Sequence, residues 1–473
     1  MSNEKKTDLQ NMNYTNFLQI KSMQSIDAGF ECEPENKNLF DFQRDIVRWA
    51  LRKGRAALFL DTGLGKTLCQ LSWAYEVCKH LNGKVLIVAP LAVSKQTQRE
   101  GEKFGVAVNI CRTQRDVKNG ISITNYEMLS HFKASEFVGI VLDESSILKH
   151  TDSMTRQYIT DVFSLIPYKL CCTATPAPND FMELGNHSEF LGVMTRSEML
   201  STYFVHDGSD TSKWRLKGHA ENKFWEWIAS WGAVLQNPRD LGYDGSNYDL
   251  PELQITEHLV DSNLFEYGKT KGFAFMTIAL TLNDRRKARN LSLEARVKCA
   301  ADIANNIEGQ VLVWCDLNAE SELLTKSIKG SVELAGKHSN DYKVEKMLGF
   351  STGKVRVLVT KPSIAGWGMN WQNCNNMIFV GLSDSFEAYY QAVRRCWRYG
   401  QKKQVDVHII TARTEGAVLE NIKRKQKNAQ IMTTELIKRT KDILKKEITG
   451  AFKITEDYNA EQEMKLPFFL GEQ

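Results

Sequence analysis

The chain has 473 residues, of which 42% are hydrophobic and 25% charged, so an ordinary globular core is expected and wholesale disorder is excluded. Typical domain sizes predict about two to four domains for this length. The 61 basic residues nearly balance the 57 acidic ones, so any phosphate-binding surface has to come from local clustering rather than from overall charge.

The ten cysteines are scattered without a CxxC pair, which indicates reduced thiols rather than a disulfide framework or a zinc site. No run of about 18 apolar residues occurs, and the N-terminal sequence MSNEKKTDLQ lacks the apolar core of a signal peptide. We therefore expect an intracellular protein that has no membrane partner.

Residues 1–36 are polar and weakly patterned, which predicts a loosely held N-terminal arm. Apolar runs of strand length then alternate with segments of helical length, which is typical of a parallel sheet covered by helices on both faces. The first series predicts an α/β lobe over residues 37–195, with strands at 56–60, 85–89, 121–124, 140–142 and 169–172. A second series predicts another lobe over residues 296–420, with strands at 311–314, 355–360, 376–380 and 405–410.

The segment between the two series, residues 196–295, differs in composition and predicts an insertion followed by an interlobe linker. One helical face of it carries four apolar residues, namely Phe224, Trp227, Ile228 and Trp231. Such a stripe is typical of core packing, with a base-stacking platform as the alternative. A basic stretch, DRRKARN, follows at 284–290.

Residues 421–473 predict a basic C-terminal helix followed by an acidic tail. Basic side chains predominate between residues 421 and 446. A solvated helix face and contact with a DNA backbone explain this run equally well.

A glycine-rich turn, DTGLGKT at 61–67, follows the first predicted strand and precedes a helical pattern. Such a turn points backbone N–H groups inward, which suits a polyphosphate. We expect Lys66 to reach the β- and γ-phosphates of ATP and the Thr67 hydroxyl to bind Mg²⁺. The usual pattern has glycine at position 60, where this chain has Leu60. The expected nucleotide-binding residues of the turn are Thr62, Gly63, Leu64, Gly65, Lys66 and Thr67.

Two carboxylates follow the strand at 140–142, in VLDESS at 141–146. We expect Asp143 to hold Mg²⁺ and Glu144 to orient and deprotonate the attacking water. The strand at 169–172 leads into CCTATP. Its hydroxyl residues, Thr173 and Thr175, either sense the γ-phosphate through the acidic pair or simply form a strand-end turn.

The second lobe contains QAVRRCWRYGQ at 391–401. A phosphate-binding turn alone does not neutralise all of the charge of the transition state. In related enzymes, an arginine from a facing lobe increases the rate of hydrolysis about 10³–10⁵-fold. Arg395 and Arg398 are three residues apart, so we expect them on one helical face, both reaching the ATP. Surface salt bridges are the alternative. Arg394 would lie on another side of the same helix and tolerate alanine.

These segments together resemble the ordered motifs of superfamily 2 helicases, and most closely those of the Swi/Snf-type DNA-dependent ATPases. The resemblance covers residues 37–425. It rests on nine segments in order: FDFQRDIVRWA (40–50), DTGLGKT, VLIVAPLAV (85–93), ITNYEML (123–129), VLDESS, CCTATP, VLVWCD (311–316), TKPSIAGWGMNWQ (360–372) and QAVRRCWRYGQ. It implies an α/β fold of two tandem RecA-like lobes, with ATP and DNA bound at the cleft between them.

The resemblance also implies roles for further residues. Gln43 would read the adenine edge, and the segments at 85–93 and 123–129 would touch the DNA backbone. A second-lobe loop would couple the grip on DNA to the nucleotide through Gly366, Gly368 and Asn370, with Gly368 contributing to the ATP site. The acidic motif reads DESS, so the contact that relatives make with a final histidine is missing or replaced.

The function that the resemblance implies is an ATP-dependent DNA translocase or helicase, with duplex DNA as the partner, contacted through its backbone. ATP-gated clamping of DNA without translocation, or an RNA helicase activity, is the alternative. The sequence shows no chromatin-reading module, so it resembles the minimal bacterial and phage forms, which implies the cytoplasm of a bacterial or phage-infected cell.

Overall fold

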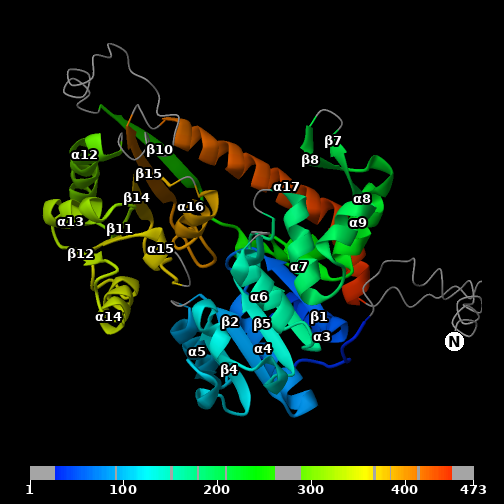
Figure 1. The fold of residues 1–473 in the computed structure, drawn as a ribbon. Coiled ribbons are helices and arrows are strands. Elements are labelled where there is room, and N and C mark those ends of the chain that lie inside the picture. Colours follow the sequence, from blue (N-terminus) through cyan, green and yellow to red (C-terminus); the bar gives the residue numbers. More distant parts are fainter. Residues whose placement is uncertain are drawn as a thin grey trace, which may run out of the picture.

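The computed structural model describes residues 27–90, 93–149, 153–177, 180–207, 210–261, 289–365, 369–383, 385–412 and 416–449. These residues form two α/β lobes, each built on a parallel sheet with helices against it (Figure 1). The predicted fold of two RecA-like lobes is confirmed. All ten cysteines are free, as expected.

The first sheet has seven strands in the order β3-β4-β2-β5-β6-β1-β9. They are β1 (Arg55–Leu60), β2 (Lys84–Ala89), β3 (Val108–Ile110), β4 (Gly120–Asn125), β5 (Gly139–Asp143), β6 (Tyr168–Cys172) and β9 (Gly232–Leu235). Alternate residues of β1 enter different cores, Leu58 on one face of the sheet and Phe59 on the other. Because both faces are covered, the central strands read as continuous apolar runs.

The helices of this lobe are α3 (Asp41–Lys53), α4 (Lys66–Leu81), α5 (Ser94–Lys103), α6 (Met154–Val162), α7 (Leu184–Leu191), α8 (Arg196–Tyr203) and α9 (Glu221–Ala229). An antiparallel hairpin of β7 (Phe204–Asp207) and β8 (Asp210–Leu216) projects beside α8 and α9 (Figure 1).

The second sheet has six parallel strands in the order β10-β15-β14-β11-β13-β12. They are β10 (Leu253–Val260), β11 (Val311–Cys315), β12 (Ser331–Leu334), β13 (Val357–Thr360), β14 (Asn376–Val380) and β15 (Val405–Ala412). The helices are α12 (Leu293–Asn306), α13 (Asn318–Ser327), α14 (Asn340–Ser351), α15 (Pro362–Ala365) and α16 (Phe386–Val393). The chain therefore enters this lobe through its edge strand β10, which pairs with β15.

The segment 196–295 differs from the insertion and linker expected there. Its strand β9 pairs with β1, with Ala57 opposite Gly232, so this part completes the first sheet. Strand β10 already belongs to the second lobe. The four residues of the aromatic stripe, Phe224, Trp227, Ile228 and Trp231, are at most 2% exposed. The stripe is therefore core packing, and a base-stacking platform is excluded. Residues 284–288 of the basic stretch lie outside the described residues.

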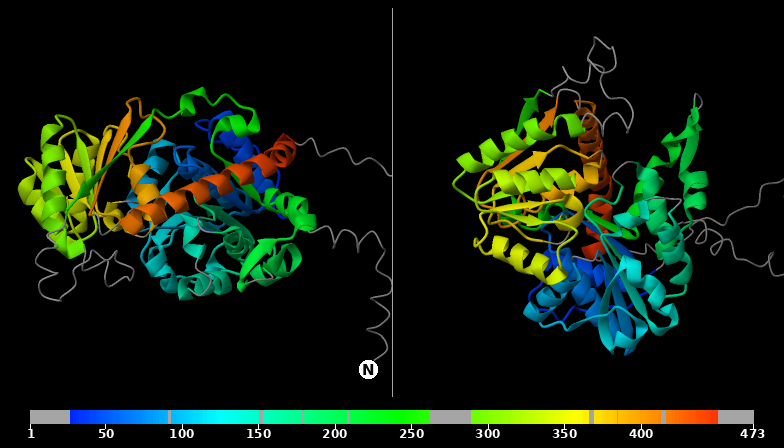
Figure 2. Two further views of the ribbon diagram at one scale, coloured as in Figure 1. Left: turned by 90° about the horizontal axis from the view of Figure 1, so that it is seen from above. Right: turned by 60° about the vertical axis from the view of Figure 1, so that its left-hand side comes forward.

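The long helix α17 (Gly416–Thr449) packs against both lobes, and both views in Figure 2 show it running along them. Its first turns place Val418 and Ile422 in the core of the second lobe. Its last turns place Leu444 and Ile448 in a core of the first lobe, where Glu447 also forms an ion pair with Lys53 at 2.9 Å. The helix therefore connects the lobes a second time, independently of the chain between β9 and β10.

The basic run on α17 is partly paired within the protein. Lys423 lies 2.6 Å from Glu257, and Arg439 lies 3.0 Å from Glu221. Within the ranges given above, no helix has the length and apolar character needed to cross a membrane. The acidic tail from residue 450 onward and residues 1–26 of the N-terminal arm lie outside those ranges.

A buried ion pair in the second lobe gives a stability prediction. Arg296 and Glu320 are fully buried with 2.5 Å between Nη1 and Oε1, and Oε2 accepts the N–H groups of Asp316 and Leu317, each at 2.9 Å. Glu320→Ala leaves the guanidinium uncompensated, so we expect a loss of about 3–5 kcal/mol in the free energy of unfolding. Denaturant unfolding measures it. Glu322→Ala, on an exposed position of the same helix, is the control and should leave the midpoint unchanged; equal losses would contradict the assignment.

Candidate active site

The phosphate loop, residues 61–67, joins the end of β1 to the start of α4. Gly63 and Gly65 have φ values of 101° and 79°, a left-handed conformation that favours glycine. A Cβ on Gly65 would lie 2.2 Å from the Gln43 side chain, and one on Gly63 would lie 2.9 Å from Cβ of Tyr399 in the second lobe. Both glycines are therefore required by conformation and by space. Leu60 belongs to the strand, so the expected glycine position is not part of the turn.

The Lys66 ammonium group lies inside this loop. It donates to the carbonyl groups of Leu60 at 2.7 Å and Asp61 at 3.3 Å. Burial lowers the pKa of Lys66, while Glu144 and Asp61 oppose the shift. Because its acceptors are neutral carbonyl groups, this cation fits an added anion such as a polyphosphate. Thr67 lies in the first turn of α4, half-buried.

Gln43 contacts the phosphate loop directly. Its Nε2 donates to the carbonyl of Leu64 at 2.9 Å, and its Oε1 accepts the N–H of Phe40 at 3.0 Å. The side chain is buried. The structure thus links this glutamine to the loop through Leu64, and its role toward adenine stays a prediction.

Asp143 is the last residue of β5, and Glu144 follows it in a strained turn. Glu144 has a φ of 55°, which is unfavourable for a residue with a side chain. The Tyr126 hydroxyl donates to the Asp143 carbonyl at 2.7 Å and helps to fix the turn. Burial raises the pKa of Glu144 to about 7, and the positive charges of Lys66 and Arg395 oppose the shift. Glu144 Oε2 is buried and has no hydrogen-bond partner in the described part of the chain.

This arrangement fits a hydrated Mg²⁺ and a general base. Asp143 is buried, and its Oδ1 accepts the N–H of Glu144 at 3.1 Å. Across the ranges that the structure describes, no three His, Cys, Asp or Glu side chains are grouped to hold a metal. A magnesium ion would therefore depend on Asp143, Thr67, water and the phosphates of a nucleotide, as the sequence predicts.

Thr173 and Thr175 form a turn of their own. The Thr175 N–H donates to Thr173 Oγ1 at 3.2 Å, and neither side chain bonds to Asp143 or Glu144 within the described residues. This geometry favours the strand-end turn over direct contact with the acidic pair.

The arginine turn, residues 394–398, follows α16, which ends at Val393. The prediction that Arg395 and Arg398 share a helical face is therefore wrong. Arg395 bonds within its own lobe, to the Met369 carbonyl at 3.1 Å and to Gln391 Oε1 at 2.9 Å, yet it remains close enough to lower the pKa of Glu144.

Arg398 is the third arginine of this turn. Its carbonyl accepts the Gln401 N–H at 3.0 Å, but no hydrogen bond or ion pair joins its side chain to a described residue. Burial lowers the pKa of Arg398 to about 9, and repulsion from Arg395 adds to the shift. The negative charge of Glu100, on α5 of the first lobe, opposes this shift of the Arg398 pKa. The turn therefore places this guanidinium at the boundary between the lobes.

The sequence predicts that Arg394 lies on another side of the same helix and tolerates alanine. The structure instead places it in contact with the phosphate loop. Its guanidinium donates to the Asp61 carboxylate and to the Thr62 carbonyl at 3.0 Å. The Tyr390 hydroxyl donates to the other Asp61 oxygen at 2.7 Å. The second lobe thus binds the first residues of the phosphate loop. A second interlobe ion pair, between Lys149 and Glu387, lies at the opposite end of α16.

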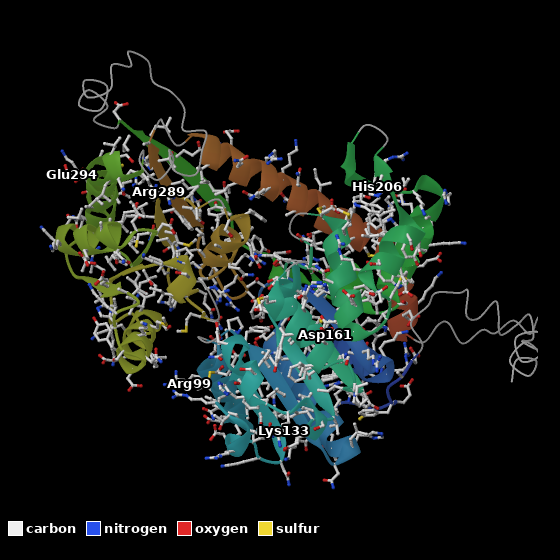
Figure 3. The ribbon with its side chains drawn as sticks, in the orientation of Figure 1. Arg99, Lys133, Asp161, His206, Arg289 and Glu294 are labelled. Carbon is white, nitrogen blue, oxygen red and sulfur yellow. The ribbon has the colours of Figure 1, made fainter. Side chains whose placement is uncertain are left out.

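A cleft of about 1170 Å³ lies between the lobes and includes Glu144 in its lining. Both segments predicted to touch DNA contribute to it, through Pro90 and through Thr124–Met128. The second lobe contributes α14 and Asn370, whereas Gly366 and Gly368 lie outside the described residues. The basic residues of the lining are Lys95, Arg99, Arg112, Lys149 and Lys343. Arg99, labelled in Figure 3, lies on α5 at the side of the first lobe that is nearer the second.

Comparisons with known proteins match both lobes. The SNF2-related domain matches residues 42–201, and the helicase conserved C-terminal domain matches residues 295–400. Chromodomain-helicase-DNA-binding protein 1 of Gallus gallus is 28% identical over 206 residues, which are 37% of this chain and 12% of that protein. The Caenorhabditis elegans homologue of SWI/SNF-related matrix-associated actin-dependent regulator of chromatin subfamily A-like protein 1 is 23% identical over 424 residues, 82% of this chain and 60% of the relative.

The matched region is less than two thirds of the length of either relative. Among solved structures, the Sulfolobus solfataricus SWI2/SNF2 ATPase core in complex with dsDNA aligns with 89% of this chain and 99% of its own, at 18% identity and a TM-score of 0.41. The SNF2-related domain falls on the first lobe and the helicase conserved C-terminal domain on the second, in the order that the motifs require, so the chain belongs to the Swi/Snf-type branch of the superfamily 2 helicases.

Proposed function

We propose that the protein is an ATP hydrolase stimulated by nucleic acid, and that it couples hydrolysis to movement along, or remodelling of, duplex DNA. The observation that carries this proposal is the meeting of three elements at one lobe boundary. The phosphate loop and the acidic pair come from the first lobe, and the arginine turn comes from the second. A cleft of about 1170 Å³ adjoins them.

Each group has a chemical task that suits its surroundings. Lys66 exchanges two carbonyl acceptors for phosphate oxygens, which carry full charge. Glu144, with a pKa near 7, is matched to accept a proton from water at neutral pH. Arg398 has no acceptor among the described residues and is available to compensate transition-state charge. Thr67 and Asp143 would hold Mg²⁺, which would supply further charge neutralisation.

The coupling of ATP hydrolysis to movement follows from the position of the nucleotide site between two lobes. Nucleotide binding adds contacts from both lobes and closes the cleft, and hydrolysis removes them. Because both lobes also line the cleft, each cycle displaces one set of DNA contacts relative to the other. Contacts to a phosphate backbone carry no sequence information, so we expect the activity to be sequence-neutral and sensitive to salt. The name of the Gallus gallus relative includes DNA binding, which favours DNA over RNA.

A second candidate function is an ATP-gated clamp that holds DNA without moving. The bonds of Arg394 with the phosphate loop and the ion pair of Lys149 with Glu387 join the lobes directly, which favours a stable closed form. Triplex displacement distinguishes the two candidates, because only a translocating protein strips a third strand from duplex DNA. A parallel strand-displacement assay reports unwinding.

The first prediction concerns stimulation by polymers. ATP hydrolysis should require Mg²⁺ and should rise on addition of duplex DNA at least as much as with single strands, because DNA aligns the two lobes. Phosphate release measured with duplex DNA, single-stranded DNA and RNA of matched sequence tests this. A rate that is indifferent to all three polymers would exclude the motor and leave only a basal ATPase.

The second prediction separates binding from chemistry. Lys66→Ala should weaken ATP binding, because the ammonium meets charge that the ground state already carries. Glu144→Gln should keep binding and abolish turnover, because the carboxylate acts on water in the transition state. Fluorescent ATP-analogue binding beside steady-state turnover measures both. Equal loss of affinity in the two variants would refute the assigned roles.

The third prediction concerns the arginine turn. Arg398→Ala should lower turnover by about 10³ with little change in ATP affinity. Arg394→Ala should instead raise the KM for ATP by roughly tenfold, since the phosphate loop loses a charged hydrogen bond. Asp61→Asn should reproduce that increase, and the double variant should be no worse than either single one. Arg115→Ala, exposed in the first lobe, is the control. Unchanged KM in both Arg394→Ala and Asp61→Asn would show that the interlobe contact is incidental.

A further inference from the structure

Helix α7 makes hydrogen bonds to the turn that follows Glu144. This short turn, Ser145–Lys149, begins immediately after the acidic pair. His187 Nε2 lies 3.2 Å from the Ser145 hydroxyl, and both side chains are fully buried. The contact joins residues 42 positions apart in the sequence.

The neighbouring residue on α7 holds the other end of the same turn. The Asn186 side-chain amide donates to the Leu148 carbonyl at 2.8 Å and to the Lys149 carbonyl at 3.2 Å. Lys149 in turn forms the interlobe ion pair with Glu387. Adjacent residues of one helix therefore fix both ends of the turn that leads from the general base to the second lobe.

Glu144 needs such support because its carboxylate makes no hydrogen bond to a described residue that would fix it. Its backbone has a φ of 55°, and an L-residue keeps that conformation only when its surroundings impose it. Its Oε2 has no partner in the described part of the chain. The direction of the carboxylate is thus set by the backbone on either side, through Asp143 and Ser145.

We propose that His187 and Asn186 are positioning residues that hold Glu144 in its working conformation, a role that rests on the ATP hydrolysis proposed above. The acidic motif of this chain ends in Ser146, where the resemblance described above implies a histidine. Here an imidazole reaches the adjacent residue, Ser145, from α7 instead. The residue that follows Glu144 is therefore held by a side chain from another element.

Histidine suits this position because it is neutral there. Burial lowers the pKa of His187 to about 4, so the ring carries no charge at neutral pH and adds no positive charge beside Glu144. The ring also packs edge-on against Phe59, with 5.3 Å between centroids. The residue thus has two separable contributions, a hydrogen bond to Ser145 and an aromatic contact to Phe59.

Two substitutions separate these contributions. His187→Phe keeps the aromatic packing and removes the hydrogen bond, whereas His187→Gln loses the ring and keeps a polar nitrogen at a similar reach. We expect His187→Phe to lower kcat roughly tenfold with unchanged KM for ATP, since one buried hydrogen bond to the turn is lost. His187→Gln should retain kcat within about threefold. Ser145→Ala should match His187→Phe, and combining the two should lower kcat no further.

A control on the same helix distinguishes positioning from general stability. Ser188 is buried on α7 and donates to the Met194 carbonyl at 2.7 Å, away from the turn. Ser188→Ala should lower the melting temperature without changing kcat. If His187 serves packing alone, His187→Phe will be tolerated and His187→Gln will be the damaging change. That inverted order would overturn the proposal.

Hydrogen–deuterium exchange of the full chain gives a readout that does not depend on turnover. Amides of residues 145–149 should exchange faster in His187→Phe than in wild type, and at the wild-type rate in His187→Gln. A wild-type protein without ATPase activity would refute the proposed function, while the exchange pattern would still decide the positioning role. Identical exchange in both variants would refute that role even in an active enzyme.

Discussion

The bond between Arg394 and Asp61 determines how the two lobes meet at the phosphate loop. Asp61 also accepts the Tyr390 hydroxyl, so one carboxylate at the start of the loop binds two groups from the second lobe. A buried guanidinium needs an acceptor of this kind, because desolvation without one costs several kcal/mol. The pairing therefore fixes the arginine turn beside the loop, and with it the neighbouring Arg395 and Arg398.

The same boundary concentrates charge that the protein only partly neutralises. Lys66 has carbonyl acceptors, Arg398 has no partner among the described residues, and Glu144 has a buried oxygen without one. Groups with shifted pKa values and without a charged partner are typical of sites where a bound ligand supplies that partner. Away from this boundary, the buried Arg296 is paired with the carboxylate of Glu320. The contrast distinguishes a site built for a polyanion from an ion pair that supports the fold.

The sequence predicted the nine strands of the two series because buried parallel strands are apolar runs, a pattern that needs no tertiary information. It predicted the phosphate loop and the acidic pair because their residues are adjacent in the chain. It missed β9 and the membership of α9 in the first core, since an aromatic-rich composition does not say which sheet it covers. The end of α16 at Val393 was missed because arginine spacing is compatible with a helix or a turn. Arg394 and His187 contact partners 333 and 42 residues away, and no local pattern indicates such pairs.

The helix α17 has 34 residues, which at 1.5 Å per residue makes a rod of about 51 Å. One end is seated in the second lobe and the other in the first, so the rod restricts how the lobes can separate. Motion that pulls the lobes apart along its length would have to extract Val418 or Leu444 from a core. The helix therefore limits how far the two lobes can separate along its length.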